Sequence, residues 1–421
     1  MTRATDTVLK GLDEIRPWVE GAYKDLHAHP ELGFQEHRTA AKVAEALRAD
    51  GYEVTEGIGG TGLIGVRRGG DGPTVMLRAD LDALPVAEAT GLPYASTATG
   101  QTADGTAVPV MHACGHDVHV ASMLGFARLM AWAPEAWRGT LVVLFQPDEE
   151  NGSGADAMVA DGLVERSPRP DVVLAQHVLP YPAGGVGTRS GSFLSAADST
   201  KVTLYGRGAH GSMPQHAIDP VVMAAMVVVR LQTVVSRELA AATPAVLTVG
   251  SITAGTGPNV IPDRAELQLN VRTYDEDTRA EVRAAVERIV RAEATASGAT
   301  RDPEFETLAA FPATVNDEAP TRTVADAFTE HFGARAHTID RQSASEDMSR
   351  IPEAFGVPFT YWGIGGTDPA AYEKAVAAGS LTSDIPVNHS PYFAPVLQPT
   401  LDTGVRALTA AALAWLAAPE G

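Results

Sequence analysis

The chain contains very little cysteine: Cys114 is the only one among its 421 residues. A single thiol cannot form an internal disulfide, so a fold stabilised by disulfides is excluded and a reducing cytoplasm is expected. No run of 18 apolar residues occurs, and the N-terminal segment lacks the apolar stretch of a signal peptide. With 45% hydrophobic and 20% charged residues, the composition predicts a soluble globular protein with no membrane partner.

Basic side chains are also few, with 32 lysines and arginines against 52 acidic residues and a net charge of −20. A protein that binds nucleic acid or an anionic membrane needs a basic face. The charge balance therefore predicts neither partner. The length exceeds what one hydrophobic core usually serves, and it favours two domains.

Three of the 12 histidines, His112, His116 and His119, lie close to the single cysteine. Thiolate and imidazole together are ligands that suit zinc and similar divalent ions. A small buried structural cysteine is the alternative. The clustering of the histidines favours a metal site.

Three short apolar runs are typical of strands that are buried on both faces of a sheet. They cover residues 74–77, 140–145 and 171–175, and a helical pattern covers residues 118–132. Strands that alternate with helices predict an α/β domain, a sheet flanked by helices.

Each of these runs ends in polar side chains of the kind that bind metals or carry protons. Asp82 follows the first run, Glu149 and Glu150 follow the second, and His177 ends the third. In such sheets the ligand site lies beyond the carboxyl ends of the strands. We therefore expect these four side chains to lie together, although a surface position for the two glutamates and a structural role for His177 remain the ordinary alternatives.

The pattern changes after about residue 192 and predicts a second, α+β domain inserted into the first. The expected domains are 1–192 (catalytic, first part), 193–311 (inserted) and 312–421 (catalytic, second part). Strands and helices of the insertion follow one another as βαββαβ, over residues 201–205, 219–238, 245–252, 266–272, 276–294 and near 305.

Four further residues are candidates for a site, each weak when taken alone. His210 lies among glycines, which let backbone approach a ligand closely. Asn259 lies in a loop, Arg272 ends a predicted strand, and His389 lies in another loop. An ordinary salt bridge is the alternative for Arg272.

Taken together, these residues and their surroundings resemble the M20 metallopeptidase family, specifically its amidohydrolase branch of aminoacylases, hippurate hydrolases and auxin-conjugate hydrolases. The resemblance extends over nearly the whole chain. It is carried by the ordered blocks at residues 27–33, 77–85, 111–119, 145–154, 206–214, 259–262, 345–348 and 388–391.

The resemblance implies a catalytic domain like that of di-metal exopeptidases, with a mixed sheet flanked by helices. It also implies two divalent ions per subunit (zinc, manganese, cobalt or nickel) and assigns Glu149 as the general acid/base, with Asp82 in a supporting role. The residues that correspond to the family's metal ligands are Cys114, His116, Glu150, His177 and His389.

By the same resemblance the inserted domain is a lid that also dimerises, so a homodimer or a higher homo-oligomer is expected. His210 would reach the active site of the partner subunit, and Asn259 and Arg272 would hold the carboxylate of the substrate. The chain departs from the family at Asn151-Gly152-Ser153-Gly154, where many members have a run of glycines. Asp80 stands where the peptidase branch has a metal-binding histidine.

The function implied is hydrolysis of the amide bond of N-acyl-L-amino acids, which yields a carboxylic acid and a free amino acid. A dipeptidase or exopeptidase of the same fold is the first alternative, and it would need a recognition site for a free α-amine. A non-catalytic metal- or ligand-binding protein is the more distant alternative.

Overall fold

The computed structural model describes residues 3–418, which form two compact units. The first unit contains residues 3–191, 316–340 and 347–418 of the described chain, and the inserted unit contains Ser192–Val315 and Arg341–Glu346. The sequence placed the boundaries after residues 192 and 311. It did not assign the short segment Arg341–Glu346 to the insertion.

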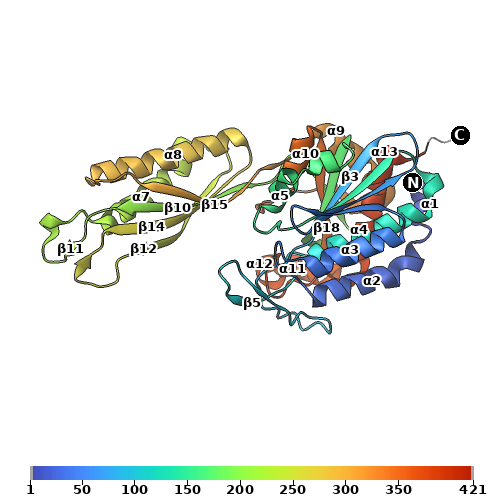
Figure 1. Cartoon of the computed structure of the whole chain (residues 1–421), viewed down its shortest axis with the longest axis horizontal. Coiled ribbons are helices and arrows are strands. Elements are labelled where there is room, and N and C mark those ends of the chain that lie inside the picture. The colour runs from blue at the N-terminus through green and yellow to red at the C-terminus, as the bar shows by residue number, and fades with distance from the viewer. Residues whose placement is uncertain (1–2, 419–421) are drawn as a thin grey trace. The chain divides into compact units, whose positions relative to one another are not determined.

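A mixed eight-stranded sheet forms the centre of the first unit (Figure 1). Parallel and antiparallel neighbours both occur in it, as in the expected fold class. Across the sheet the strands are β1 (Glu53–Ile58), β2 (Gly62–Arg68), β6 (Thr140–Gln146), β3 (Thr74–Asp80), β7 (Val172–Pro182), β18 (Phe359–Thr367), β8 (Val186–Thr188) and β17 (Ala336–Thr338).

Three neighbouring strands, β6, β3 and β7, position the candidate site. β3 pairs in parallel with both of the others, so their carboxyl ends meet at one edge of the sheet. All but the first residue of β3 and of β6 are buried, because helices cover both faces of a parallel region. This explains why their sequences are continuous apolar runs without alternation.

Helix α4 (His116–Trp132) begins at this edge and is buried along almost its whole length. It packs against β3 and against α2 (Leu12–Ala28), α3 (His37–Ala49) and α13 (Leu397–Leu416), and only its C-terminal end, with Trp132, reaches the surface. The other helices of the first unit are α1 (Arg3–Leu9), α5 (Gly154–Ala160), α6 (Leu163–Arg166), α9 (Glu318–Phe332), α10 (Arg350–Phe355), α11 (Pro369–Ala378) and α12 (Leu381–Asp384).

The inserted unit has the expected βαββαβ order. Its four-stranded sheet has the order β12 (Val246–Ala254), β14 (Arg264–Thr273), β10 (Ala196–Tyr205) and β15 (Glu304–Phe311). Helices α7 (Pro220–Thr233) and α8 (Glu276–Ala296) cover the face formed by alternate residues of β14 (Figure 1). A short ribbon, β11 (Ala209–His210) with β13 (Val260–Ile261), extends from this unit.

Within the described residues, the segment Pro220–Glu238 is long and apolar enough to cross a membrane by length and composition, with a mean hydropathy of 1.4. The sequence predicts a helix over residues 219–238 but no membrane span, because Arg230 and the polar residues after it interrupt the apolar run. One side of the segment packs into the core of the inserted unit, as a core helix does. The other side exposes apolar residues: Val222 is 58%, Met226 48% and Val229 65% exposed.

Candidate metal centre

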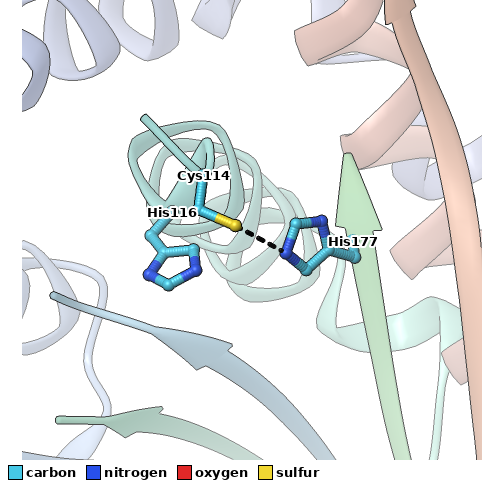
Figure 2. Close-up of side chains that lie close together, drawn as sticks. All are labelled: Cys114, His116 and His177. Carbon is cyan, nitrogen blue, oxygen red and sulfur yellow. Dashed lines mark hydrogen bonds between the residues drawn. The ribbon is translucent and has the colours of Figure 1, made fainter. Parts of the chain in front are cut away.

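The turn into α4 brings Cys114 and His116 beside His177 in the middle of β7, a strand that continues to Pro182 and does not end at His177 as the sequence predicted. Gly115 makes this possible because its backbone has a φ of 86°, and a Cβ added there would lie 2.4 Å from Val178 Cγ1. Only glycine fits both the conformation and the space. Cys114 Sγ consequently lies 3.4 Å from Nε2 of His177 (Figure 2).

Backbone carbonyls fix the orientation of two of the imidazoles. His177 Nδ1 donates to the carbonyl oxygen of Val178 at 2.8 Å, and His116 Nδ1 donates to that of Asp82 at 2.8 Å. A nitrogen that faces a carbonyl must carry the hydrogen, so Nε2 is the ring nitrogen left to bind an ion. This is the arrangement in which a protein presents imidazole to a metal.

The turn after β6 adds two carboxylates. Oxygens of Glu149 and Glu150 each lie 3.8 Å from His116 Nε2, and the other oxygen of Glu150 lies 3.2 Å from Nε2 of His389. Asp82 supports this turn, because its Oδ2 accepts the backbone N–H of Glu150 at 3.0 Å. The first unit therefore brings all five predicted ligands together, with Glu149 beside them.

The spacing of these atoms fits a metal ion. Ligand atoms at bond lengths of about 2.0–2.3 Å around a tetrahedral ion are about 3.3–3.8 Å apart. The candidate ligand atoms form overlapping groups of three, and within each group the atoms lie within 4.8 Å of one another. Three of these groups are Cys114, His116 and His177; Cys114, Glu150 and His389; and His116, Glu149 and Glu150. Among the described residues His116 Nε2 and Glu150 Oε1 are buried without a hydrogen-bond partner, as atoms reserved for a cation would be.

The electrostatics also favour a cation. Burial, with Glu150 close by, raises the pKa of the Cys114 thiol, and burial raises the pKa of Glu150 to about 8. Burial, with His119 close by, lowers the pKa of His177. Burial alone would lower the pKa of His116, but the carboxylate of Asp80 outweighs it and raises this pKa well above its usual range. Without a cation, protons therefore occupy several of the ligand groups. A divalent ion would take the place of the protons.

Asp80 and His119 form a buried pair behind the ligands. Asp80 accepts from Nδ1 of His119 at 2.6 Å and from Arg78 at 2.7 Å, and His119 Nε2 accepts the backbone N–H of Val178 at 2.9 Å. Both nitrogens of His119 are thus occupied. The pair links β3 to the residue after His177, and Asp80 is held by its own donors at the position where the peptidase branch has a metal histidine.

The sequence analysis missed a hydrogen-bonded cluster that holds the acidic turn. Asp148 has a φ of 49°, rare for a residue other than glycine, and its carboxylate accepts from Asn151 Nδ2 and Ser153 Oγ, each at 2.6 Å. The backbone N–H of Asp148 donates to buried Glu36 at 2.9 Å. The two side chains by which the chain departs from the family therefore turn back onto Asp148. The sequence signal that could have indicated this cluster is the spacing of Asp148, Asn151 and Ser153 within one tight turn.

The remaining predicted residues belong to the inserted unit. His210 is exposed on β11, and its Nδ1 accepts from the backbone N–H and the hydroxyl of Ser212. Asn259 lies beside it, because its carbonyl oxygen accepts the N–H of Gly211 at 2.7 Å. The inserted unit brings these two together.

Arg272 lies at the other end of the inserted unit. Arg264, at the start of β14, lines the same hollow as His210, and the eight residue-to-residue steps along the strand from Arg264 to Arg272 span about 26 Å. The inserted unit of one chain therefore does not bring Arg272 to Asn259. Arg272 donates to Asn270 at 3.0 Å and to Ser345 at 2.7 Å, and no carboxylate of the described residues pairs with it.

A thiolate, imidazoles and a carboxylate around a space of cation size, with a second carboxylate beside them at the edge of an α/β sheet, define a metal-dependent hydrolase. Residues 76–386 match the sequence profile of peptidase family M20/M25/M40, and the chain belongs to this family as a metal-dependent amidohydrolase.

Known relatives cover most of the chain. It is 34% identical to a thermostable carboxypeptidase of Saccharolobus solfataricus over 84% of this chain and 86% of that protein. It is 35% identical to an N-acetyl-L-cysteine deacetylase of Bacillus subtilis over 84% and 82%. A dinuclear metal-binding M20 peptidase of B. subtilis superimposes with a TM-score of 0.76 at 27% identity, over 95% of this chain and 98% of that one.

Proposed function

We propose that the enzyme hydrolyses the amide bond of N-acyl-L-amino acids. The observation that carries this substrate class is Arg272. Its guanidinium is partly buried, burial lowers its pKa, and no carboxylate among the described residues neutralises it. A partly buried guanidinium without a carboxylate partner can bind the carboxylate of a substrate through charge-assisted hydrogen bonds. The deacetylase relative supports the same class.

The two glutamates divide the chemistry. Glu150 lies within ligand distance of both Cys114 and His389, whereas Glu149 approaches His116 from outside that group. Divalent ions bound here would polarise the amide carbonyl and acidify water. Glu149 accepts a proton from the attacking water on a carboxylate oxygen and donates it to the nitrogen of the leaving amine.

The identity of the metal is part of the proposal. A thiolate ligand favours zinc, while three imidazoles and a carboxylate also accept manganese, cobalt or nickel. A thiolate ligand must also stay reduced, which supports a cytoplasmic location. Elemental analysis of the purified protein, followed by chelation and reloading with each ion, identifies the metal that restores turnover.

We also propose a homodimer with composite active sites. The distance between Arg272 and the pair His210–Asn259 within the inserted unit means that two chains are needed if all three contact one substrate. The exposed apolar face of α7, formed by Val222, Met226 and Val229, is a surface that a second copy would cover.

The test of the substrate class compares an N-acyl amino acid with its carboxamide. In Arg272→Ala the preference for the free carboxylate, expressed as kcat/KM, falls about 10- to 100-fold, since such a bond contributes about 1.5–3 kcal/mol. Arg291→Ala is the control, because Arg291 on α8 is exposed and already paired with Glu287. An unchanged preference in Arg272→Ala removes the residue from the carboxylate site.

The carboxypeptidase relative favours one second candidate, an exopeptidase. Hippurate and glycyl dipeptides separate the two functions, because only the exopeptidase would prefer a substrate with a free α-amine. A higher kcat/KM for the glycyl dipeptides than for hippurate would identify the enzyme as an exopeptidase and contradict the proposed function.

A further inference from the structure

Asn388, which precedes the ligand His389, contacts two other ligand-bearing segments. Its side-chain nitrogen donates to the carbonyl oxygen of Cys114 at 3.1 Å and to that of Val178 at 3.2 Å. Because both acceptors are carbonyl oxygens, the nitrogen of the amide must face them. The same nitrogen lies 3.8 Å from Cys114 Sγ.

The carbonyl oxygen of Val178 accepts two hydrogen bonds. One comes from the side-chain nitrogen of Asn388 and the other from His177 Nδ1, and this second bond sets the direction of the His177 lone pair. Asn388 thus holds the Val178 carbonyl, which orients His177, and it is also hydrogen-bonded to the backbone of Cys114. The segments it joins are distant in sequence, since 274 residues separate Asn388 from Cys114 and 210 from Val178.

His389 needs such support more than the other ligands do. It is on a loop, its side chain is 57% exposed, and its φ of 71° is in the left-handed region, which a residue other than glycine rarely adopts. Its own backbone N–H donates to the carbonyl oxygen of Ala113 at 2.8 Å. The backbone bond from His389 and the side-chain bonds from Asn388 attach this loop to the residues on either side of the Ala113–Cys114 peptide bond.

We propose that Asn388 is a positioning residue of the metal centre, which holds the Cys114, His177 and His389 segments at ligand distance. Its side-chain nitrogen contacts the carbonyl oxygens of Cys114 and Val178 and the sulfur of Cys114, so it acts through the ligands. This inference rests on the assignment of the metal centre, not on the substrate class.

The test uses the full-length protein and Co²⁺ alone. In Asn388→Leu, which keeps the size of the side chain and removes the donors, the dissociation constant for cobalt rises about 10- to 100-fold, the range seen when groups that orient ligands are lost. The absorption band for charge transfer from thiolate to cobalt weakens or shifts, which a general loss of stability would not cause.

Asn316→Leu is the matched control. Asn316 also donates to two carbonyl oxygens, those of Arg189 and Tyr361, each at 2.8 Å, and it contacts none of the ligands. This variant lowers the unfolding temperature of the metal-free protein but leaves cobalt affinity and the band unchanged. If Asn388→Leu does not fold, Asn388→Ser retains one donor and gives a smaller change in the same direction.

Two results overturn the proposal. One is wild-type cobalt affinity and an unchanged band in Asn388→Leu, or in Asn388→Ser where only that variant folds. The other is an equal loss of affinity in Asn316→Leu, which would make the effect one of general stability. If the wild-type protein shows no thiolate-to-cobalt band, the assignment of the metal centre itself is wrong. This result differs from the two above, which contradict only the role of Asn388.

Discussion

Glu149 and Glu150 are neighbours in one turn, and we propose different roles for them, general base for Glu149 and metal ligand for Glu150. Glu149→Gln should lower kcat by at least about 100-fold while metal content stays unchanged, because a general base is lost. Glu150→Gln should lower metal content, because Glu150 is within ligand distance of Cys114 and His389. Elemental analysis and kcat for hippurate, measured on both variants, check this division. Equal metal content and equal residual rates would contradict it.

Single residues could be predicted from the sequence where the residue type is itself unusual. A lone cysteine among histidines indicated a metal, and polar residues after apolar runs indicated the edge of the sheet. Asn388 and Glu36 could not be predicted in this way, because their partners lie 274 and 112 residues away and either type is common on surfaces. Only the fold places these residues beside their partners.

At the scale of elements, the turn after β6 depends on side chains that bond within it. In the double variant Asn151→Gly, Ser153→Gly, Asp148 loses two donors, each of which contributes about 1 kcal/mol. The free energy of unfolding should therefore fall by about 2 kcal/mol, and the dissociation constant for metal should rise. Urea unfolding of the metal-free protein and competition with a chelator measure the two effects. Unchanged metal affinity would show that the turn holds Glu150 without them.

A second element-scale contact joins α2 to α4. His27 Nδ1 donates to Asp117 at 2.6 Å, and Nε2 donates to Glu88 at 3.1 Å. Burial alone would lower the pKa of His27, but the hydrogen bonds to Asp117 and Glu88 outweigh it and raise the pKa from 6.5 to about 10. The folded protein therefore holds a charged imidazolium over most of the neutral range.

The stability that comes from this charge depends on pH with a definite sign. Because the folded pKa of His27 lies above the unfolded one, the contribution is complete below the unfolded pKa of about 6.5. It is lost as the pH rises towards 10. The difference in unfolding free energy between wild type and His27→Gln should be largest near the lower end of this window and shrink with rising pH.

For the whole molecule, a complementation experiment tests the proposed composite dimer. His210→Ala and Glu149→Gln homodimers should each be nearly inactive. A heterodimer would hold one site with both defects and one with neither, so re-equilibrated mixtures should recover up to about half of the wild-type activity per dimer, if the sites act independently. A mixture as inactive as its parents, or an active monomer, would contradict the composite site.

The fold class was predictable because strand burial and helix periodicity are local properties of sequence. The α/β sheet and the βαββαβ insertion both follow from such patterns. The segment Arg341–Glu346 could not be assigned, because its place in the inserted unit depends on partners elsewhere in the chain, such as the bond of Arg272 to Ser345. Nor could sequence show that Arg272 and Asn259 lie at opposite ends of that unit.

The discontinuity of the first unit has a consequence for biosynthesis. Cys114, Glu150 and His177 leave the ribosome before the inserted unit, whereas Asn388 and His389 leave it long after, 210 residues beyond Val178. A nascent chain can therefore present an incomplete set of ligands throughout synthesis of the insertion. With the proposed set of ligands, full metal capture would be a late step, and the enzyme would become competent only when the last part of the chain has folded.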